Sequence, residues 1–331
     1  MTSVAELTTP ALCVDAAAFG HNLTTMSSAL PGLRLRPHVK AHKCTTIARL
    51  QAAAGHRAFC AATTREIEGL AAAGLGDDLL LANEVVDPAR LERLARLDAR
   101  VTVAVDSATT VAAAADAGLR EVLVDVDVGL PRCGCPPQEA ARIAEMAAGR
   151  GLEVRGVMGY EGHVVGLADR GERARLCDAA MEMLAEAHSL VGGEVVSAGG
   201  TGTYDVNTFA TEVQAGSYIL MDTAYARLDI PFRIALGVVA TVVSVSGAYA
   251  VADCGLKALG MDHGNPGVEG AAVWFCSDEH VTFAPDSPVR VGDRVRVVPA
   301  HVDPTVAYHE RMYLVSGDEV LEEWPVDLRG W

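Results

Sequence analysis

Short apolar runs alternate with alanine-rich stretches along the first part of the chain. An apolar run bounded by turn residues predicts a buried strand, and an alanine-rich stretch with spaced apolar residues predicts a helix. The predicted strands cover residues 33–39, 58–62, 78–82, 101–106, 121–128, 154–160, 194–198 and 213–221. The predicted helices cover residues 16–30, 88–97, 107–118, 137–150 and 169–190.

This alternation gives eight β/α units over about 200 residues, which is typical of a TIM barrel. Only the last link, 203–211, is too short for more than a brief helix. A doubly wound open sheet is the alternative, but that fold usually has fewer strands and a glycine-rich phosphate turn after the first one. Here the glycine-rich turn comes late, at 199–202, so the pattern favours the barrel.

The alternation stops near residue 230, and short β-branched runs broken by Gly, Asp and Pro follow. They lie at 235–246, 248–253, 272–276, 294–298 and 311–315. These runs predict an all-β domain of roughly 100 residues, which the short strand at 10–15 is expected to join. The predicted fold class is therefore α/β, with a TIM barrel over 16–229 and a β-domain built from 1–15 plus 230–331.

Composition limits the partners and the compartment. The chain carries a formal net charge of −16, which repels nucleic acids and anionic membranes. No apolar run is long enough to span a bilayer, and residues 1–10 lack the features of a secretory signal. Eight cysteines are scattered without framework spacing, so reduced thiols and a cytoplasmic location are expected. The Cys133-Gly134-Cys135 spacing alone gives weak support for a metal or redox pair.

Lys40 is the first candidate for chemistry. In a TIM barrel the loops after the strands converge on one face, and Lys40 follows the first predicted strand in the segment RPHVKAHK, 36–43. A partly desolvated lysine among other cations has a lowered pKa, and its neutral amine can attack a carbonyl. The neighbouring cations are Arg36, His38, His42 and Lys43. Taken alone, the segment also fits a basic surface turn.

Glycine-rich turns after the last two strands have the composition of a phosphate site. Gly200, Thr201 and Gly202 follow the seventh strand, and Gly216, Ser217 and Tyr218 follow the start of the eighth. Glycines let backbone N–H groups approach an anion, and hydroxyl side chains add donors. Phosphate sites of TIM barrels are formed by these same loops. Gly-Gly-Thr-Gly by itself is more often only a loop.

A lysine on the same face as a phosphate site suggests pyridoxal phosphate, with its aldehyde on Lys40 and its phosphate on the glycines. Arg132 follows the fifth strand and Tyr160 ends the sixth. Both side chains could hydrogen-bond the phenolate oxygen and the pyridine nitrogen of the ring. Without the cofactor argument, ordinary surface and core roles fit these two residues equally well.

His301 and Asp303 form a second candidate group in the β-domain. If the pair ends a strand, the period of two places the imidazole and the carboxylate on one side of the chain. One nitrogen and one hard oxygen suit Mn²⁺, Zn²⁺ or Mg²⁺, with water completing the shell. An isolated His-x-Asp pattern is poor support by itself. The remaining histidines show no comparable arrangement.

Together these segments resemble the D-threonine aldolase and D-serine dehydratase family, pyridoxal-phosphate enzymes of the alanine-racemase fold. The resemblance covers nearly the whole chain and includes the segments 9–15, 36–43, 160–163, 197–203, 216–218, 253–258 and 301–303. It implies that Lys40 bonds the cofactor and that the 200–203 and 216–218 segments hold its phosphate. It also implies that His301 and Asp303 hold a divalent metal, Mn²⁺ being favoured, and that two chains form a homodimer with the site near the interface.

The family divides at the metal pair. In the family members that dehydrate D-serine the metal pair looks like His-x-Cys, whereas in the aldolases it looks like His-x-Asp. This chain has Asp303 at the second position. The resemblance therefore implies a lyase that cleaves D-3-hydroxy amino acids to glycine and an aldehyde. His163 or His38 could assist proton transfer.

Three alternatives remain open. The first is a D-serine or D-3-hydroxyaspartate dehydratase that uses the same Lys40 and metal site. The second is an amino-acid racemase, but Tyr249 and Tyr308 lie in no recognised racemase motif. The third is a non-catalytic pyridoxal-phosphate carrier, which would lack the β-domain at 230–331.

Overall fold

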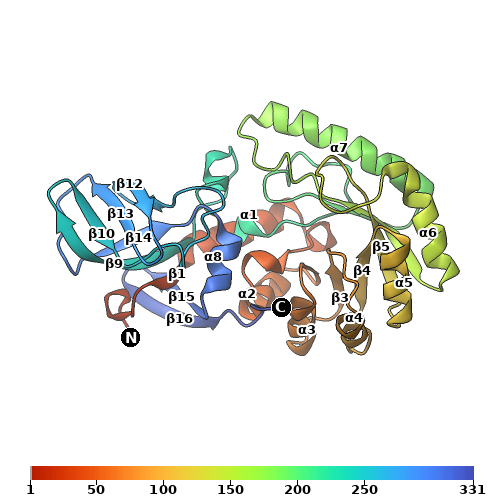
Figure 1. Cartoon of the computed structure of the whole chain (residues 1–331), viewed down its shortest axis with the longest axis horizontal. Coiled ribbons are helices and arrows are strands. Elements are labelled where there is room, and N and C mark those ends of the chain that lie inside the picture. The colour runs from red at the N-terminus through yellow and green to blue at the C-terminus, as the bar shows by residue number, and fades with distance from the viewer. Residues whose placement is uncertain (1) are drawn as a thin grey trace. The chain divides into compact units, whose positions relative to one another are not determined.

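The computed structural model describes residues 2–331 (Figure 1). Contacts divide the chain into two compact units. The barrel unit comprises Met26–Lys40, Ile47–Gly216 and Gly330–Trp331. The β unit comprises the residues up to Thr25, Ala41–Thr46 and Ser217–Arg329. No helix within residues 2–331 has the length and apolar character that a membrane crossing requires.

The barrel unit contains a seven-stranded parallel sheet in which the strands follow one another in chain order. They are β2 (Ala58–Ala61), β3 (Asp78–Leu81), β4 (Val101–Val105), β5 (Glu121–Asp125), β6 (Glu153–Gly159), β7 (Val195–Ala198) and β8 (Glu212–Val213). Leu35 forms a parallel bridge with Val213, and His38 forms one with Cys60. The segment 35–38 therefore lies between the two edge strands and closes the ring where the first barrel strand was predicted.

Two predicted strands are shorter than the sequence indicated. In 33–39 a 3-10 turn, Gly32–Arg34, occupies the start, and only the bridged residues pair with neighbours. In 213–221 the pairing ends after β8, and Ser217–Ile219 forms a second 3-10 turn. The segment 213–221 is largely apolar and buried, and burial alone does not distinguish a strand from a packed turn.

Helices alternate with the barrel strands, as Figure 1 shows. They are α2 (Thr45–Ala53), α3 (Thr64–Ala72), α4 (Pro88–Ala95), α5 (Ala108–Asp116), α6 (Ala140–Gly149) and α7 (Arg170–Val191). Side chains set several of their starts: Thr63 and Ser107 form capping boxes, and Asp87 and Asp169 accept hydrogen bonds from the first turn. The interior of the ring is apolar at mid-height, where Cys60, Leu80, Ala104, Leu123, Met158 and Val195 pack together.

The β unit is built on a nine-stranded sheet with the order β10-β13-β12-β11-β14-β9-β1-β15-β16. The strands are β1 (Ala11–Asp15), β9 (Leu236–Ser246), β10 (Tyr249–Ala252), β11 (Gly267–Val268), β12 (Ala271–Cys276), β13 (Val281–Pro285), β14 (Arg294–Val298), β15 (Arg311–Ser316) and β16 (Glu319–Pro325). Because β10 also pairs with β9, the strands from β9 to β14 close into a barrel.

The N-terminal strand joins this sheet as the sequence predicted. β1 pairs antiparallel with β9 and parallel with β15. The helix α1 (Ala16–Ala29) follows it directly. A second helix, α8 (Val302–Tyr308), was not predicted, because it is short and contains Pro304. All eight cysteines are free.

Candidate functional site

Lys40 lies in the 3-10 turn Val39–Ala41, which follows the bridged segment that closes the barrel. Its side chain is half-buried, and its backbone N–H lies 3.5 Å from Nδ1 of the buried His38. The amine therefore belongs to the turn after a barrel strand, as the sequence predicted. Arg36 does not add an unpaired cation near it, because its guanidinium is paired with Asp78 and Glu212.

Arg132 and Tyr160 are brought together by two loops of the barrel unit. The guanidinium carbon of Arg132 lies 5.4 Å from the centroid of the Tyr160 ring, within cation–π distance. The Arg132 loop is closed at its base, where Cys135 exchanges backbone hydrogen bonds with Asp125 and Asp127. Gly134 has a φ of 103°, and a Cβ there would lie 2.5 Å from the Asp127 nitrogen, so the turn requires glycine. Arg132 is exposed, and Tyr160 is half-buried.

The glycine loop after β7 leaves no room for a side chain at Gly202. A Cβ on Gly202 would lie 1.8 Å from the carbonyl oxygen of Val165. A Cβ on Gly200 would meet Val165 and Tyr160 at 3.4–3.5 Å. Thr201 is buried beside them. Glycines let the backbone approach an anion, and Thr201 and Thr203 carry hydroxyls, so the composition of this loop fits the phosphate of pyridoxal phosphate.

Glu161 organises this loop, a role that was not predicted from the sequence. Its carboxylate is fully buried and accepts three hydrogen bonds from the loop. Gly199 N–H donates to Oε2 at 3.1 Å, and the Thr203 hydroxyl and Asn207 Nδ2 donate to Oε1 at 2.7 and 3.2 Å. Gly200 N–H in turn donates to Thr203 Oγ1 at 3.1 Å. A single anion therefore fixes both ends of the glycine loop.

Carboxyl groups gather at the C-terminal ends of β3 to β5. Asp125 is buried, and burial together with the neighbouring Glu84 raises its pKa well above the usual value. Arg132 acts in the opposite direction. This environment favours the protonated form of Asp125 beside the loop that presents Arg132, which the sequence did not indicate.

Ser217 and Tyr218, the other predicted phosphate contacts, lie in the β unit. Both are buried in the 3-10 turn Ser217–Ile219, and the Tyr218 ring packs against Phe232 with a centroid distance of 5.6 Å. Ser217 Oγ lies 3.5 Å from Oδ1 of Asp303. The structure therefore brings a predicted phosphate residue next to a predicted metal ligand. Gly216 ends the barrel unit just before this turn.

His301 and Asp303 stand at the start of α8. His301 is the N-cap residue with an extended backbone, and Asp303 lies in the first turn. The argument from strand periodicity was wrong, because β14 ends at Val298 and a helix begins at Val302. The two side chains still lie half-buried within one helical turn. Imidazole nitrogen plus carboxylate oxygen is a donor set that fits a divalent metal.

Two further side chains contact the imidazole ring of His301. Asp262 Oδ2 lies 2.7 Å from His301 Nδ1, and the ring of His263 stacks on the ring of His301 with centroids 4.1 Å apart. Ligand atoms of Asp262, His263 and His301 all lie within 4.8 Å of one another. The sequence analysis missed Asp262 and His263, since nothing in their spacing links them to a residue about 40 positions away.

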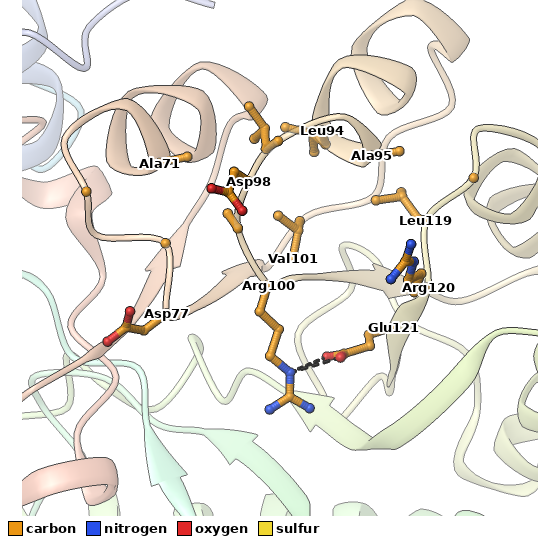
Figure 2. A pocket seen from close by; sticks show the side chains of 15 residues that line it. Ala71, Asp77, Leu94, Ala95, Asp98, Arg100, Val101, Leu119, Arg120 and Glu121 are labelled. Carbon is orange, nitrogen blue, oxygen red and sulfur yellow. Dashed lines mark hydrogen bonds and ion pairs between the residues drawn. The ribbon is translucent and has the colours of Figure 1, made fainter.

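A cavity of about 620 Å³ lies at the opposite end of the barrel strands (Figure 2). It is lined by the turns that precede β3, β4 and β5, and Arg100 Nε donates there to Glu121 at 2.9 Å. None of the predicted site residues lines it. Chemistry in this fold occurs at the C-terminal ends of the strands, so the cavity is not the candidate site.

Comparison with known proteins decides the family. A family model of the alanine racemase N-terminal domain matches residues 14–224, and one of a serine dehydratase domain matches residues 235–315. A D-threonine aldolase of Arthrobacter sp. is 34% identical, with 99% of this chain and 94% of the relative covered. A 3-hydroxy-D-aspartate aldolase of Paracoccus denitrificans (strain Pd 1222) is also 34% identical, with 98% and 93% covered.

The chain belongs to the D-threonine aldolase and D-serine dehydratase family. The crystal structure of D-threonine aldolase from Filomicrobium marinum matches with a TM-score of 0.94 at 34% identity and covers 99% of this chain and 97% of that one. The predicted family and fold class are therefore confirmed. Members of this family are pyridoxal-phosphate lyases, and this chain is an enzyme of that type.

The family also contains dehydratases. D-threo-3-hydroxyaspartate dehydratase from Delftia sp. HT23 has a TM-score of 0.90 at 25% identity, with both chains fully covered. Solved variants of that dehydratase replace a histidine and, two positions later, a cysteine, and the cysteine variant is described as metal-free. The higher identity to the aldolases favours an aldolase for this chain.

Proposed function

We propose that the protein is a pyridoxal-phosphate- and divalent-metal-dependent aldolase that cleaves D-3-hydroxy amino acids to glycine and an aldehyde. The observation that carries the proposal is the His-x-Asp pair at 301 and 303. The D-threo-3-hydroxyaspartate dehydratase has a cysteine two positions after a histidine, and its cysteine variant was solved in the metal-free form. A carboxylate in that place offers a harder ligand, which favours Mn²⁺ over Zn²⁺.

The barrel unit provides the groups that would hold the cofactor. Lys40 would supply the amine that holds the aldehyde group of the cofactor. Backbone N–H groups and hydroxyls of the 200–203 loop would hold the phosphate, with Glu161 keeping the loop in shape. Arg132 and Tyr160, whose side chains contact each other, would contact the ring of the cofactor.

The β unit provides the groups that would act on the substrate hydroxyl. His301 and Asp303 would hold the divalent metal, and Ser217, 3.5 Å from Asp303, would donate to that carboxylate or to the phosphate. When bound, pyridoxal phosphate draws in the electron pair left at the α-carbon, and a divalent cation favours loss of the hydroxyl proton. His38 and His163 are the proposed side chains for proton transfer to the α-carbon.

The decisive experiment is product analysis of the purified holoenzyme with D-threonine, D-3-hydroxyaspartate and D-serine, in Mn²⁺, in Zn²⁺ and in chelator. We expect glycine and acetaldehyde from D-threonine, or glycine and glyoxylate from D-3-hydroxyaspartate. Chelation of the metal is expected to abolish the formation of these products. A 2-oxo acid and ammonia would instead place the protein with the dehydratases. Lys40→Ala is expected to abolish the cofactor absorbance and turnover, and full turnover of this variant would contradict the proposal.

Two further proposals concern the setting of the enzyme. The eight free cysteines favour a reducing compartment, and we propose the cytoplasm. We also propose a homodimer, which sedimentation of the holoenzyme tests directly. A monomer with full activity would contradict the dimer.

A further inference from the structure

We propose that Asp262 is a positioning residue for the metal ligand His301. Its carboxylate fixes the proton of His301 on Nδ1, so that the Nε2 lone pair is the one offered to a divalent cation. This inference rests on the proposed metal site and adds a residue to it. The observation behind it is the 2.7 Å separation between Asp262 Oδ2 and His301 Nδ1.

The backbone around His301 is held from several sides. Gly260 and His301 form an antiparallel bridge, and the Thr305 hydroxyl donates to the His301 carbonyl at 2.7 Å. Asp222 Oδ2 accepts the N–H of Val302 at 2.9 Å. A Cβ on Gly260 would lie 2.3 Å from Pro304 Cγ, so this approach requires glycine. With the backbone fixed, the remaining freedom of His301 is the orientation and tautomer of its ring.

Asp262 removes that remaining freedom. A carboxylate accepts only, so a hydrogen bond between Asp262 and a neutral His301 requires the ring proton to be on Nδ1. The other nitrogen then carries the lone pair. Histidines that bind metals in proteins almost always donate their other ring N–H to a carboxylate, a carbonyl or water, which orients the ring and raises its basicity.

The same geometry argues against His263 as a third ligand. A metal lies near the plane of each imidazole that binds it, along the nitrogen lone pair. The rings of His263 and His301 are nearly parallel, at 8°, with centroids 4.1 Å apart. Two stacked rings cannot both direct an in-plane lone pair at one ion. The His263 ring therefore covers one face of the His301 ring.

Asp262 hydrogen-bonds His301 and not His263. The distance from Asp262 Oδ2 to His263 Nε2 is 3.7 Å, which exceeds hydrogen-bond length. Asp262 is 55% exposed, so its substitution removes a surface side chain and leaves the core intact. A loss of metal affinity in such a variant reports the hydrogen bond to His301.

The test compares Asp262→Ala and Asp262→Asn with Asp278→Ala, which removes another exposed carboxylate of the same unit. Each protein is prepared with bound pyridoxal phosphate, and Mn²⁺ affinity is measured by electron paramagnetic resonance of the free ion. Asp262→Ala is expected to bind Mn²⁺ about 10–100-fold more weakly. Asp262→Asn is expected to lose less, because an amide oxygen still accepts the Nδ1 proton. Asp278→Ala should match the unchanged protein.

A second measurement reads the tautomer without metal. Protein labelled with ¹⁵N-histidine is compared with His301→Gln, which assigns the His301 signals, in long-range ¹H–¹⁵N spectra of the holoenzyme. In the unchanged protein, His301 is expected to carry its proton on Nδ1. In Asp262→Ala this tautomer should no longer be the dominant one. A protonated Nε2 in the unchanged protein would overturn the inference.

The outcomes separate the inference from the proposed function. Mn²⁺ binding that is lost in His301→Gln but kept within threefold in Asp262→Ala overturns the role of Asp262 alone. Mn²⁺ binding that is equal in the unchanged protein and in His301→Gln overturns the metal site itself, and the role of Asp262 with it.

Discussion

At the scale of single residues, the barrel unit holds its glycine loop with one buried anion. Glu161 accepts from a backbone N–H, a hydroxyl and an amide, so all of its loop partners are donors. A donor that loses its buried acceptor costs about 1–3 kcal/mol. The conformation of the loop therefore depends on the acceptor oxygens of this side chain.

Glu161→Ala is expected to weaken pyridoxal-phosphate binding by about 10–100-fold, because three donors lose their acceptor and the loop rearranges. Glu161→Gln is expected to lose less, because its Oε1 can still accept from Thr203 and Asn207 while its amide group faces the Gly199 N–H. Absorbance titration of the cofactor-free protein measures the affinity. Glu182→Ala on the exposed face of α7 is the control. Cofactor affinity of Glu161→Ala that equals the control would show that the loop is held by other contacts.

Asp303 is the residue on which the proposed reaction depends most directly. Asp303→Ala is expected to keep its cofactor absorbance, because Lys40 and the glycine loop are unchanged. Removal of the carboxylate leaves His301 as the remaining protein ligand of the proposed pair, so activation by Mn²⁺ should fall at least tenfold. Turnover is measured against metal concentration with D-threonine. Unchanged activation by Mn²⁺ would remove Asp303 from the metal site.

The sequence predicted some of these residues and not others, for a physical reason. Lys40 and the glycine loop follow predicted strands, so the period of the barrel assigned them to one end of it. Glu161 and Asp262 act through contacts with Thr203 and His301 that are 42 and 39 positions distant. Such pairs depend on tertiary packing, and no local pattern indicates them.

At the scale of elements, the predictions succeeded where the β/α period repeats. The strands β2 to β7 and the helices α4 to α7 were located within a few residues, because each repeats the same apolar period, whereas β11, β13 and β16 of the β unit were not predicted. The helix α8 was missed because one turn contains Pro304, and β8 was overextended because a buried 3-10 turn follows it. The strand-end geometry predicted for the His301–Asp303 pair was thus wrong, and its role in metal binding stays a prediction.

The glycine loop offers a matched test of element geometry. Gly202→Ala is expected to lower cofactor affinity at least tenfold, because its Cβ would lie 1.8 Å from the Val165 carbonyl and the loop must shift. Gly166→Ala is the control, since nothing lies within 4 Å of a Cβ there. Cofactor titration and urea unfolding are measured for both. Equal cofactor affinity of the two variants would show that the loop adjusts without consequence.

At the scale of the whole chain, the alternation of strands and helices indicated the barrel, and the break near residue 230 indicated a separate β-domain. What the pattern did not contain is the charged network inside the barrel unit. Asp78 accepts from both Arg36 and Arg155 at 3.0–3.1 Å, and Arg155 also lies 3.5 Å from Glu121. These charges come from the strands β3, β5 and β6 and from the bridged segment 35–38, and only the closure of the barrel brings them together.

This network predicts how stability changes with pH. Burial opposes ionisation of Asp78, but hydrogen bonds and charge from Arg155 and Arg36 outweigh it and lower its pKa from 3.8 to about 2. Because the folded pKa is lower than the unfolded one, ionised Asp78 stabilises the folded chain above pH 4. That contribution, about 2 kcal/mol, is lost as the pH falls from 4 to 2.

Urea unfolding of the unchanged protein and of Asp78→Asn, followed from pH 7 to pH 2, tests the prediction. Asp78→Asn leaves two buried arginines with one acceptor fewer and is expected to be several kcal/mol less stable at pH 7. The difference between the two proteins should shrink by about 2 kcal/mol between pH 4 and pH 2, because only the unchanged protein loses the ionised carboxylate. Asp98→Asn, an exposed carboxylate of the same unit, should show no such change. A stability difference for Asp78→Asn that stays constant over this range would mean that its pKa is not lowered and that the arginines hold the barrel through their other partners.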